Sequence, residues 1–190
     1  MRNMYLFLLH IPSNIEIDKE KEKLSHLSFD HWLQHDLFSI NWWILFLATI
    51  IPYFIFWRVV DKNRFFEVFS YGMFAATLCM LLDIIGTEML LWSYPDKLLP
   101  IITPLIPANM VIIPISAMLV YQYFSTWKYF LLATIGWSIV FSYIIEPLFM
   151  LRDMFVIGEH WSHTKSFVGF IILGILLKSV FERIKKHIPK

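Results

Sequence analysis

Three polar side chains lie inside long apolar segments of this sequence, and their chemistry could bind a ligand or carry a proton. Asp83 lies in LCMLLDIIGTEML, Asn109 in LIPANMVIIPI and Glu146 in FSYIIEPLFM. Charged groups in such surroundings are costly, so they usually face the interior of a helix bundle and mark a functional path or site. Asp83 is therefore the residue around which we build the candidate site.

Neighbouring side chains could complete a polar pocket around these three. Thr87 lies one helical turn after Asp83, and Tyr143 lies one turn before Glu146. Two aromatic residues directly follow the acidic helix. The candidate ligand-binding set is Asp83, Thr87, Trp92, Tyr94, Asn109, Tyr143 and Glu146.

Helical geometry places the polar side chains at similar depths. At about 1.5 Å per residue, Asp83 and Asn109 each lie roughly 13 Å below the outer boundary, with Glu146 somewhat shallower. One interpretation is a pocket open to the outer face, in which Asp83 and Glu146 carry protons or bind a head group. The alternative is structural, with these side chains hydrogen-bonding between helices in the absence of any ligand. The sequence allows a carboxylate or a protonated carboxyl, and it assigns no catalytic residue.

Other patterns of reactive residues are weaker. His31 and His35 have the i, i+4 spacing of metal ligands, and Glu159, His160 and His163 form a second group. Without an HExxH motif, solvated histidines at the interface are favoured over a metal, so neither a metal nor a cofactor is assigned. GxSxG, Walker-type and GxGxxG motifs are absent, which disfavours a conventional hydrolase or a nucleotide-driven pump.

The composition indicates that a lipid bilayer surrounds much of this chain. The 190 residues are 58% hydrophobic and 18% aromatic, with a mean hydropathy of +0.61, and the apolar residues form long runs typical of a multi-pass membrane protein. The net charge of +1 argues against a nucleic-acid partner. A single cysteine, Cys79, excludes an intramolecular disulfide and a CxxC motif.

Hydropathy and periodicity predict an all-α membrane protein, an irregular bundle of five transmembrane helices with an amphipathic surface helix before it. Residues 1–39 form an N-terminal tail with the interfacial helix at 28–38, capped by Ser28. Residues 40–184 form the membrane domain, and 185–190 a basic cytoplasmic tail. Each span approaches the roughly 20 residues needed to cross a bilayer. The expected spans are residues 41–60, 66–91, 101–124, 129–151 and 166–181. Four prolines, at 100, 104, 107 and 114, predict a distorted third helix.

Basic residues predict the orientation. Arg58, Lys62 and Arg64 surround the first short loop, Lys128 marks the third, and the C-terminal tail is basic. By the positive-inside rule these segments lie in the cytoplasm, with the N-terminus outside.

Several motifs occur in one order along residues 41–181: VDKNR, D-x-x-G-x5-W-x-Y-P-x3-LP, YQYF-x-x-WK and EPLF. In these the chain resembles an uncharacterised family of small multi-pass membrane proteins from spore-forming Firmicutes. The resemblance implies a bacterial cytoplasmic membrane location and no particular activity.

A fainter resemblance is to lycopene cyclase domains of the heterodimeric type. Asp83, Gly86, Trp92 and Tyr94 match the first part of that family's pattern. Its second part calls for acids where this chain has Asn109, and an amide cannot supply the proton that polyene cyclisation needs. The resemblance therefore implies at most a similar fold and an apolar pocket.

The sequence favours an integral membrane protein that binds a lipid-like or amphipathic small ligand in an outer-leaflet polar pocket. A membrane-embedded enzyme acting on an isoprenoid or lipid, and a structural subunit of another membrane protein, are the alternatives. The expected partners are the lipid bilayer, a lipid or isoprenoid ligand, and a membrane-protein partner or second copy of the chain.

Overall fold

The computed structural model describes residues 12–100 and 104–187. The start of the predicted N-terminal tail, the first residues of the third predicted span and the end of the basic tail lie outside these residues. Helices dominate the described chain, so the predicted all-α class is confirmed. Two short strands, β1 (Trp92–Ser93) and β2 (Val156–Ile157), are the exceptions among the described residues.

The helical elements follow one another along the chain with short connections. They are α2 (Asn14–His31), the π-helical turn η1 (Trp32–Asp36), α3 (Ile40–Val59), the 3-10 turn η2 (Lys62–Arg64), α4 (Phe65–Glu88), the π-helical turn η3 (Pro107–Ile112), α5 (Ile113–Tyr123), α6 (Trp127–Val140), the π-helical turn η4 (Phe141–Ile145), α7 (Glu146–Met150) and α8 (His163–Lys186).

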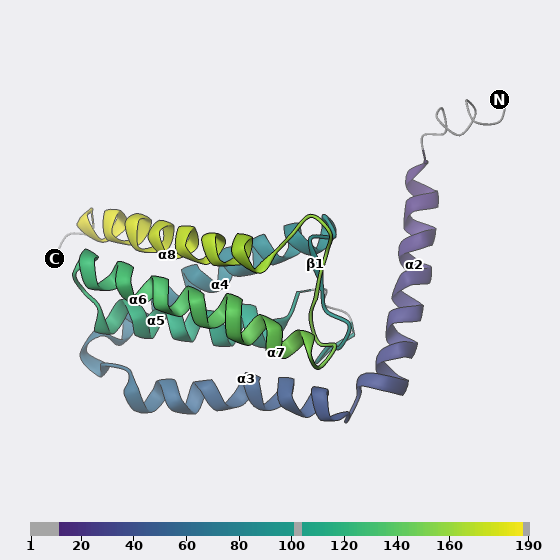
Figure 1. Cartoon of the computed structure of the whole chain (residues 1–190), viewed down its shortest axis with the longest axis horizontal. Helices are drawn as coiled ribbons and strands as arrows, with labels where there is room; N and C mark the ends of the chain where they lie inside the picture. Colours follow the sequence, from purple (N-terminus) through teal and green to yellow (C-terminus); the bar gives the residue numbers. More distant parts are fainter. Residues whose placement is uncertain (1–11, 101–103, 188–190) are drawn as a thin grey trace.

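Helices α3, α4, α5, α6 and α8 run side by side as a bundle (Figure 1). Three stretches of the described chain are long and apolar enough to cross a membrane: Ile40–Val59, Lys62–Glu88 and Trp127–Met150. Many of their large apolar side chains are exposed on the bundle surface, such as Phe54 and Phe66. Exposed apolar surface of this extent is compatible with contact with lipid.

The other two predicted spans are helical but differ from these three. The described helix of the third begins only at Pro107, and its first turn is π-helical, so the distortion predicted from the prolines is confirmed. Proline lacks the N–H that an α-helical turn needs, and widened turns accommodate such interruptions. Helix α8 carries a buried lysine, Lys178, and a basic last turn.

The N-terminal helix is longer than predicted. It begins at Asn14, where Ser13 accepts a hydrogen bond from the Glu16 N–H and the Glu16 side chain returns one to the Ser13 backbone. This capping box is readable in the sequence as S-x-x-E, and it starts the helix four turns early. Ser28 is therefore an interior residue of α2, and the prediction that it caps the helix is wrong. Helix α2 runs across the direction of the bundle helices (Figure 1).

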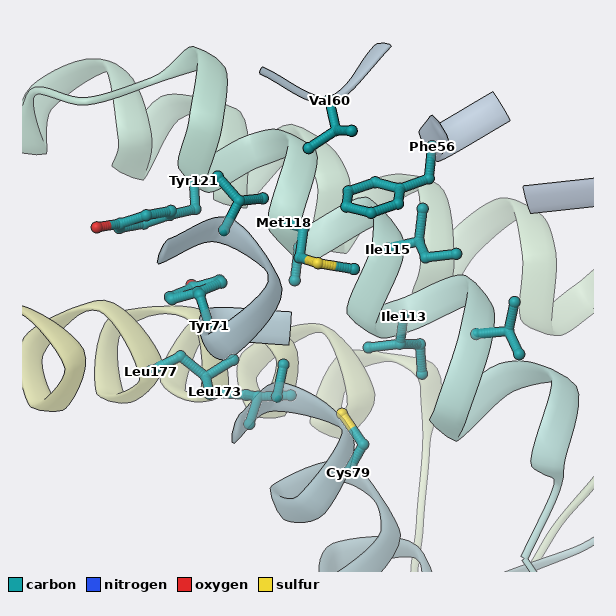
Figure 2. Close-up of a cluster of buried hydrophobic side chains, with 14 residues drawn as sticks. Phe56, Val60, Tyr71, Cys79, Ile113, Ile115, Met118, Tyr121, Leu173 and Leu177 are labelled. Atoms are coloured by element: carbon teal, nitrogen blue, oxygen red, sulfur yellow. The ribbon is translucent and has the colours of Figure 1, made fainter. Parts of the chain in front are cut away.

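The apolar core lies between α3, α4, α5 and α8. Figure 2 shows its side chains pointing toward one another, among them the stacked pair Tyr71 and Tyr121, whose ring centroids are 4.3 Å apart. Gly72 allows the close approach of α4 and α5, because a Cβ there would lie 2.3 Å from the sulfur of Met118. This core fixes α4 and α8 at the end of the bundle away from the strands.

The loops that carry β1 and β2 are tied together at the opposite end of the bundle. Strands β1 and β2 pair antiparallel, with Trp92 opposite Ile157. The segment after β1 is also anchored to the N-terminal region. The indole of Trp32 donates to the Lys97 carbonyl (3.1 Å), and the Lys97 N–H donates to Asp36 Oδ2 (3.1 Å). These contacts hold the loop that carries Tyr94 over the end of the bundle.

Candidate functional site

Asp83 is buried on α4, with 4% of its surface exposed. Four groups donate hydrogen bonds to its carboxyl: to Oδ1 the indole Nε1 of Trp92 (2.7 Å) and the hydroxyl of Tyr94 (2.8 Å), and to Oδ2 the backbone N–H of Leu105 (3.2 Å) and the amide Nδ2 of Asn109 (2.6 Å). A carboxylate has about four acceptor positions. All of them are used by this chain.

These donors fill the acceptor positions of the Asp83 carboxyl. An indole N–H, a backbone N–H and an amide NH₂ can only donate, whereas the Tyr94 hydroxyl can also accept. Burial and the Asp83 charge raise the pKa of Tyr94 well above its ordinary value, which keeps that phenol protonated as a donor. The Asp83 carboxyl is thus held in place by four donors from other parts of the chain.

A glycine positions one of these donors. Gly86 lies nearly one turn after Asp83 on α4, and a Cβ there would lie 2.1 Å from the indole of Trp92. The missing side chain lets the indole lie against the helix and reach Oδ1. The Asp-x-x-Gly spacing therefore leaves room for the Trp92 indole beside the carboxyl that it contacts.

Asn109 reaches Asp83 from the π-helical turn η3. Its own N–H donates to the Leu105 carbonyl (3.0 Å), so the segment before Pro107 turns back over the helix start. This presents the Leu105 N–H and the Asn109 side chain to the same carboxylate oxygen. Backbone N–H groups at a helix start favour a nearby anion.

Glu146 carries the second carboxyl group, at the start of α7. His163 Nδ1 lies 2.8 Å from Glu146 Oε2, and the Ser166 side chain also hydrogen-bonds this carboxyl. The indole of Trp161 in turn donates to Ser166 Oγ (2.9 Å). The first turn of α8 and the loop before it therefore orient Glu146.

One cavity of about 350 Å³ joins the two carboxyl groups. Its wall comes from α4, the β1 segment, η3, η4 with α7, and α8. Most lining side chains are apolar, and those of Leu82 and Ile85 are also exposed on the bundle surface. The cavity therefore combines a long apolar wall, which reaches the outer surface, with a few polar groups. That composition is typical of small-molecule sites.

Two of the three π-helical turns in the described chain contribute to this wall. Ala108, Asn109 and Ile112 come from η3, while Phe141 and Ile145 come from η4. Such turns are rare in proteins and are frequent at functional sites. Their convergence on one cavity is independent support for a site there.

Five of the predicted residues line this cavity, and two do not. The five are Asp83, Trp92, Tyr94, Asn109 and Glu146. Thr87 is buried, but its hydroxyl donates to the Asp83 backbone carbonyl (2.8 Å), as helical threonines often do. Tyr143 is 45% exposed, and its hydroxyl donates to Thr164 Oγ1 (3.3 Å). Tyr143 and Glu146 both contact the first turns of α8, but only Glu146 lines the cavity.

Sequence reasoning missed three contributors. These are Trp161, Ser166 and the Leu105 N–H. No motif linked them to the acids, because Leu105 is far from Asp83 in the sequence and Ser166 is far from Glu146, while Trp161 acts only through Ser166. His163 was interpreted as a solvated loop residue, yet it begins α8 and contacts Glu146. Among the described residues, no group of three or more His, Cys, Asp or Glu side chains is arranged to hold a metal ion.

Comparisons with protein families, with curated proteins and with solved structures found no match to this chain. The functional argument therefore depends on the chemistry of the cavity.

Proposed function

We propose that this is an integral membrane protein that binds a lipid-like or amphipathic small ligand in the cavity between Asp83 and Glu146. The observation that carries the proposal is the cavity itself, whose wall is mostly apolar and carries the buried carboxyl of Asp83 and the half-buried carboxyl of Glu146. An amphipathic molecule satisfies both parts. Its apolar body fills the volume left by the helices, and its head group meets the polar end.

The proposed topology has five crossings, with the N-terminus outside and the C-terminus in the cytoplasm of a bacterial cell. Helices α5 and α8 lie alongside the helices of the three apolar stretches (Figure 1), and the proposed topology gives them the same depth. The α3–α4 connection, the α5–α6 connection and the end of α8 lie together at one end of the bundle (Figure 1). Basic residues concentrate there, which the positive-inside rule associates with the cytoplasm. The cavity and the strands then lie toward the outer leaflet.

A membrane-embedded enzyme acting on an isoprenoid or lipid is the second candidate. The specific observation in its favour is the Glu146–His163 pair, 2.8 Å apart at the cavity wall. A carboxyl and an imidazole in contact can exchange a proton, and His163 is partly exposed at 30% of its side chain. Turnover of a bound ligand would distinguish this candidate from simple binding.

Native mass spectrometry with lipid extraction tests the proposal. Gly169 is an exposed residue of the cavity lining, and a Cβ there meets nothing within 4 Å, so Gly169→Leu is designed to add a side chain at the cavity with room for its first atom. Gly136 on α6 also has open space around it but is not part of the wall, so Gly136→Leu is the matched control.

We expect a defined molecule to co-purify with wild type and Gly136→Leu and to be lost from Gly169→Leu. If all three carry only the same bulk phospholipids, the ligand proposal fails. Asp83 and Glu146 would then be interhelical contacts of a structural subunit, and a search for a membrane-protein partner would follow.

A further inference from the structure

The charges at the cavity have one sign. Asp83 and Glu146 carry the only carboxyl groups among the described residues that line it, and no lysine, arginine or histidine is among those residues. His163 contacts Glu146 without being part of the wall. An amphipathic ligand therefore meets a negative field at the polar end of a cavity in a low-dielectric environment.

Hydrogen-bond capacity at the wall also selects the head group. The donors around Asp83 are directed at its carboxyl: Trp92, Tyr94 and Leu105 each use their one polar hydrogen there, and Asn109 uses one of the two on its amide nitrogen. A phosphate or carboxylate head group would find no cation among them, and only the second N–H of the Asn109 amide as a further donor. Phosphate sites normally supply arginine, lysine or unpaired N–H groups.

Aromatic rings form much of the wall near the acids. The Trp92 and Trp161 centroids are 4.9 Å apart, and the Tyr94 and Phe155 centroids are 5.6 Å apart. All four rings line the cavity. Aromatic faces attract ammonium groups, and cages of such rings recognise quaternary ammonium ligands.

We infer that the ligand is a lipophilic cation, an apolar body with one protonated amine or quaternary ammonium group. The inference depends on the proposed function, because it names the ligand class of the same cavity. Glu146 is the direct counter-ion. Asp83 has no free acceptor position, so it contributes its charge without direct contact.

Binding of three probes with the same nonyl chain tests the inference: nonyltrimethylammonium, the neutral nonanol and the anionic nonylsulfonate. Each is titrated calorimetrically into purified protein in a non-ionic detergent, and titration into protein-free micelles is subtracted. We expect saturable binding of the cation at least about tenfold tighter than binding of the sulfonate, a difference of about 1.4 kcal/mol. Gly169→Leu should abolish this binding, and Gly136→Leu should retain it.

Glu146→Gln separates charge from shape, because it keeps the size of the side chain and removes its charge. It should weaken cation binding about tenfold or more and leave nonanol binding within about twofold. If the variant weakens both probes equally, the effect is structural and the counter-ion role is wrong.

The outcomes separate this inference from the proposed function. Equal binding of cation and sulfonate, or tighter binding of the sulfonate, overturns the cationic ligand and leaves an amphipath-binding cavity. Absence of saturable cation binding also overturns it, while the extraction experiment still decides whether the cavity holds another amphipath.

Discussion

Replacing Asp83 by asparagine should strongly destabilise the protein. The carboxylate accepts hydrogen bonds from four groups, and each of them depends on it as an acceptor. An asparagine amide has one oxygen, which can serve the two donors on one side. Its NH₂ group then faces two further donors. Turning the NH₂ toward Trp92 and Tyr94 is the better orientation, since the tyrosine hydroxyl can rotate and accept.

The expected loss in the free energy of unfolding follows from these hydrogen bonds. Two hydrogen bonds to a charged acceptor are lost, each worth about 1.5–3 kcal/mol, and the two that remain become neutral. After partial recovery by Tyr94, we expect a loss of about 3–5 kcal/mol. That is a large fraction of the roughly 5–15 kcal/mol that stabilises a typical protein. Trp92→Phe is the graded control, because it keeps an aromatic ring and removes one donor, for about 1.5–3 kcal/mol.

Unfolding in mixed micelles, titrated with an anionic detergent and followed by far-UV circular dichroism, measures both variants against wild type. Asp83→Asn should lose more stability than Trp92→Phe. A loss below about 1 kcal/mol for Asp83→Asn, or a larger loss for Trp92→Phe, would refute the account of Asp83 as a saturated anion.

Three further predictions concern the groups around this centre. Gly86→Ala should lower the unfolding midpoint by displacing the Trp92 indole, since its Cβ would lie 2.1 Å from that ring; unchanged tryptophan fluorescence and midpoint would contradict the packing. Lys178→Met should cost about 1–3 kcal/mol, because the buried ammonium donates to two carbonyls at the end of α5 (3.2 and 2.7 Å); a midpoint at or above that of wild type would contradict this role. Burial raises the pKa of Asp36 above its ordinary 3.8. The stability associated with its neutral form is therefore complete below that value and is lost as pH rises through the raised pKa. Asp36→Asn should stabilise the protein at about pH 7 relative to wild type and have little effect at about pH 4, and a difference independent of pH in thermal melts would argue against it.

The predicted site shows what could be anticipated from single segments. Asp83, Gly86, Trp92 and Tyr94 lie within one short stretch, so their proximity followed from local spacing. Asn109 and Glu146 were predicted to join the site because the helical rise places them, on separate helices, at depths similar to that of Asp83. Tyr143 lies outside the cavity wall, because its hydroxyl is hydrogen-bonded to Thr164 on α8 and 45% of its surface is exposed. The N-terminal helix was placed too late because the capping box at Ser13 was overlooked.

The sequence by itself determined the helical class and the apolar stretches suited to a membrane. Each helix satisfies its own backbone hydrogen bonds, and its composition depends on nothing outside it. Only the tertiary structure decided which partners meet. Asn109 reaches Asp83 across 26 residues, and His163 reaches Glu146 across 17. Helix packing and the pairing of β1 with β2 bring these residues together. No local sequence pattern specifies how the helices are rotated against one another. The saturation of Asp83 by four donors, and the cavity beside it, follow from that packing.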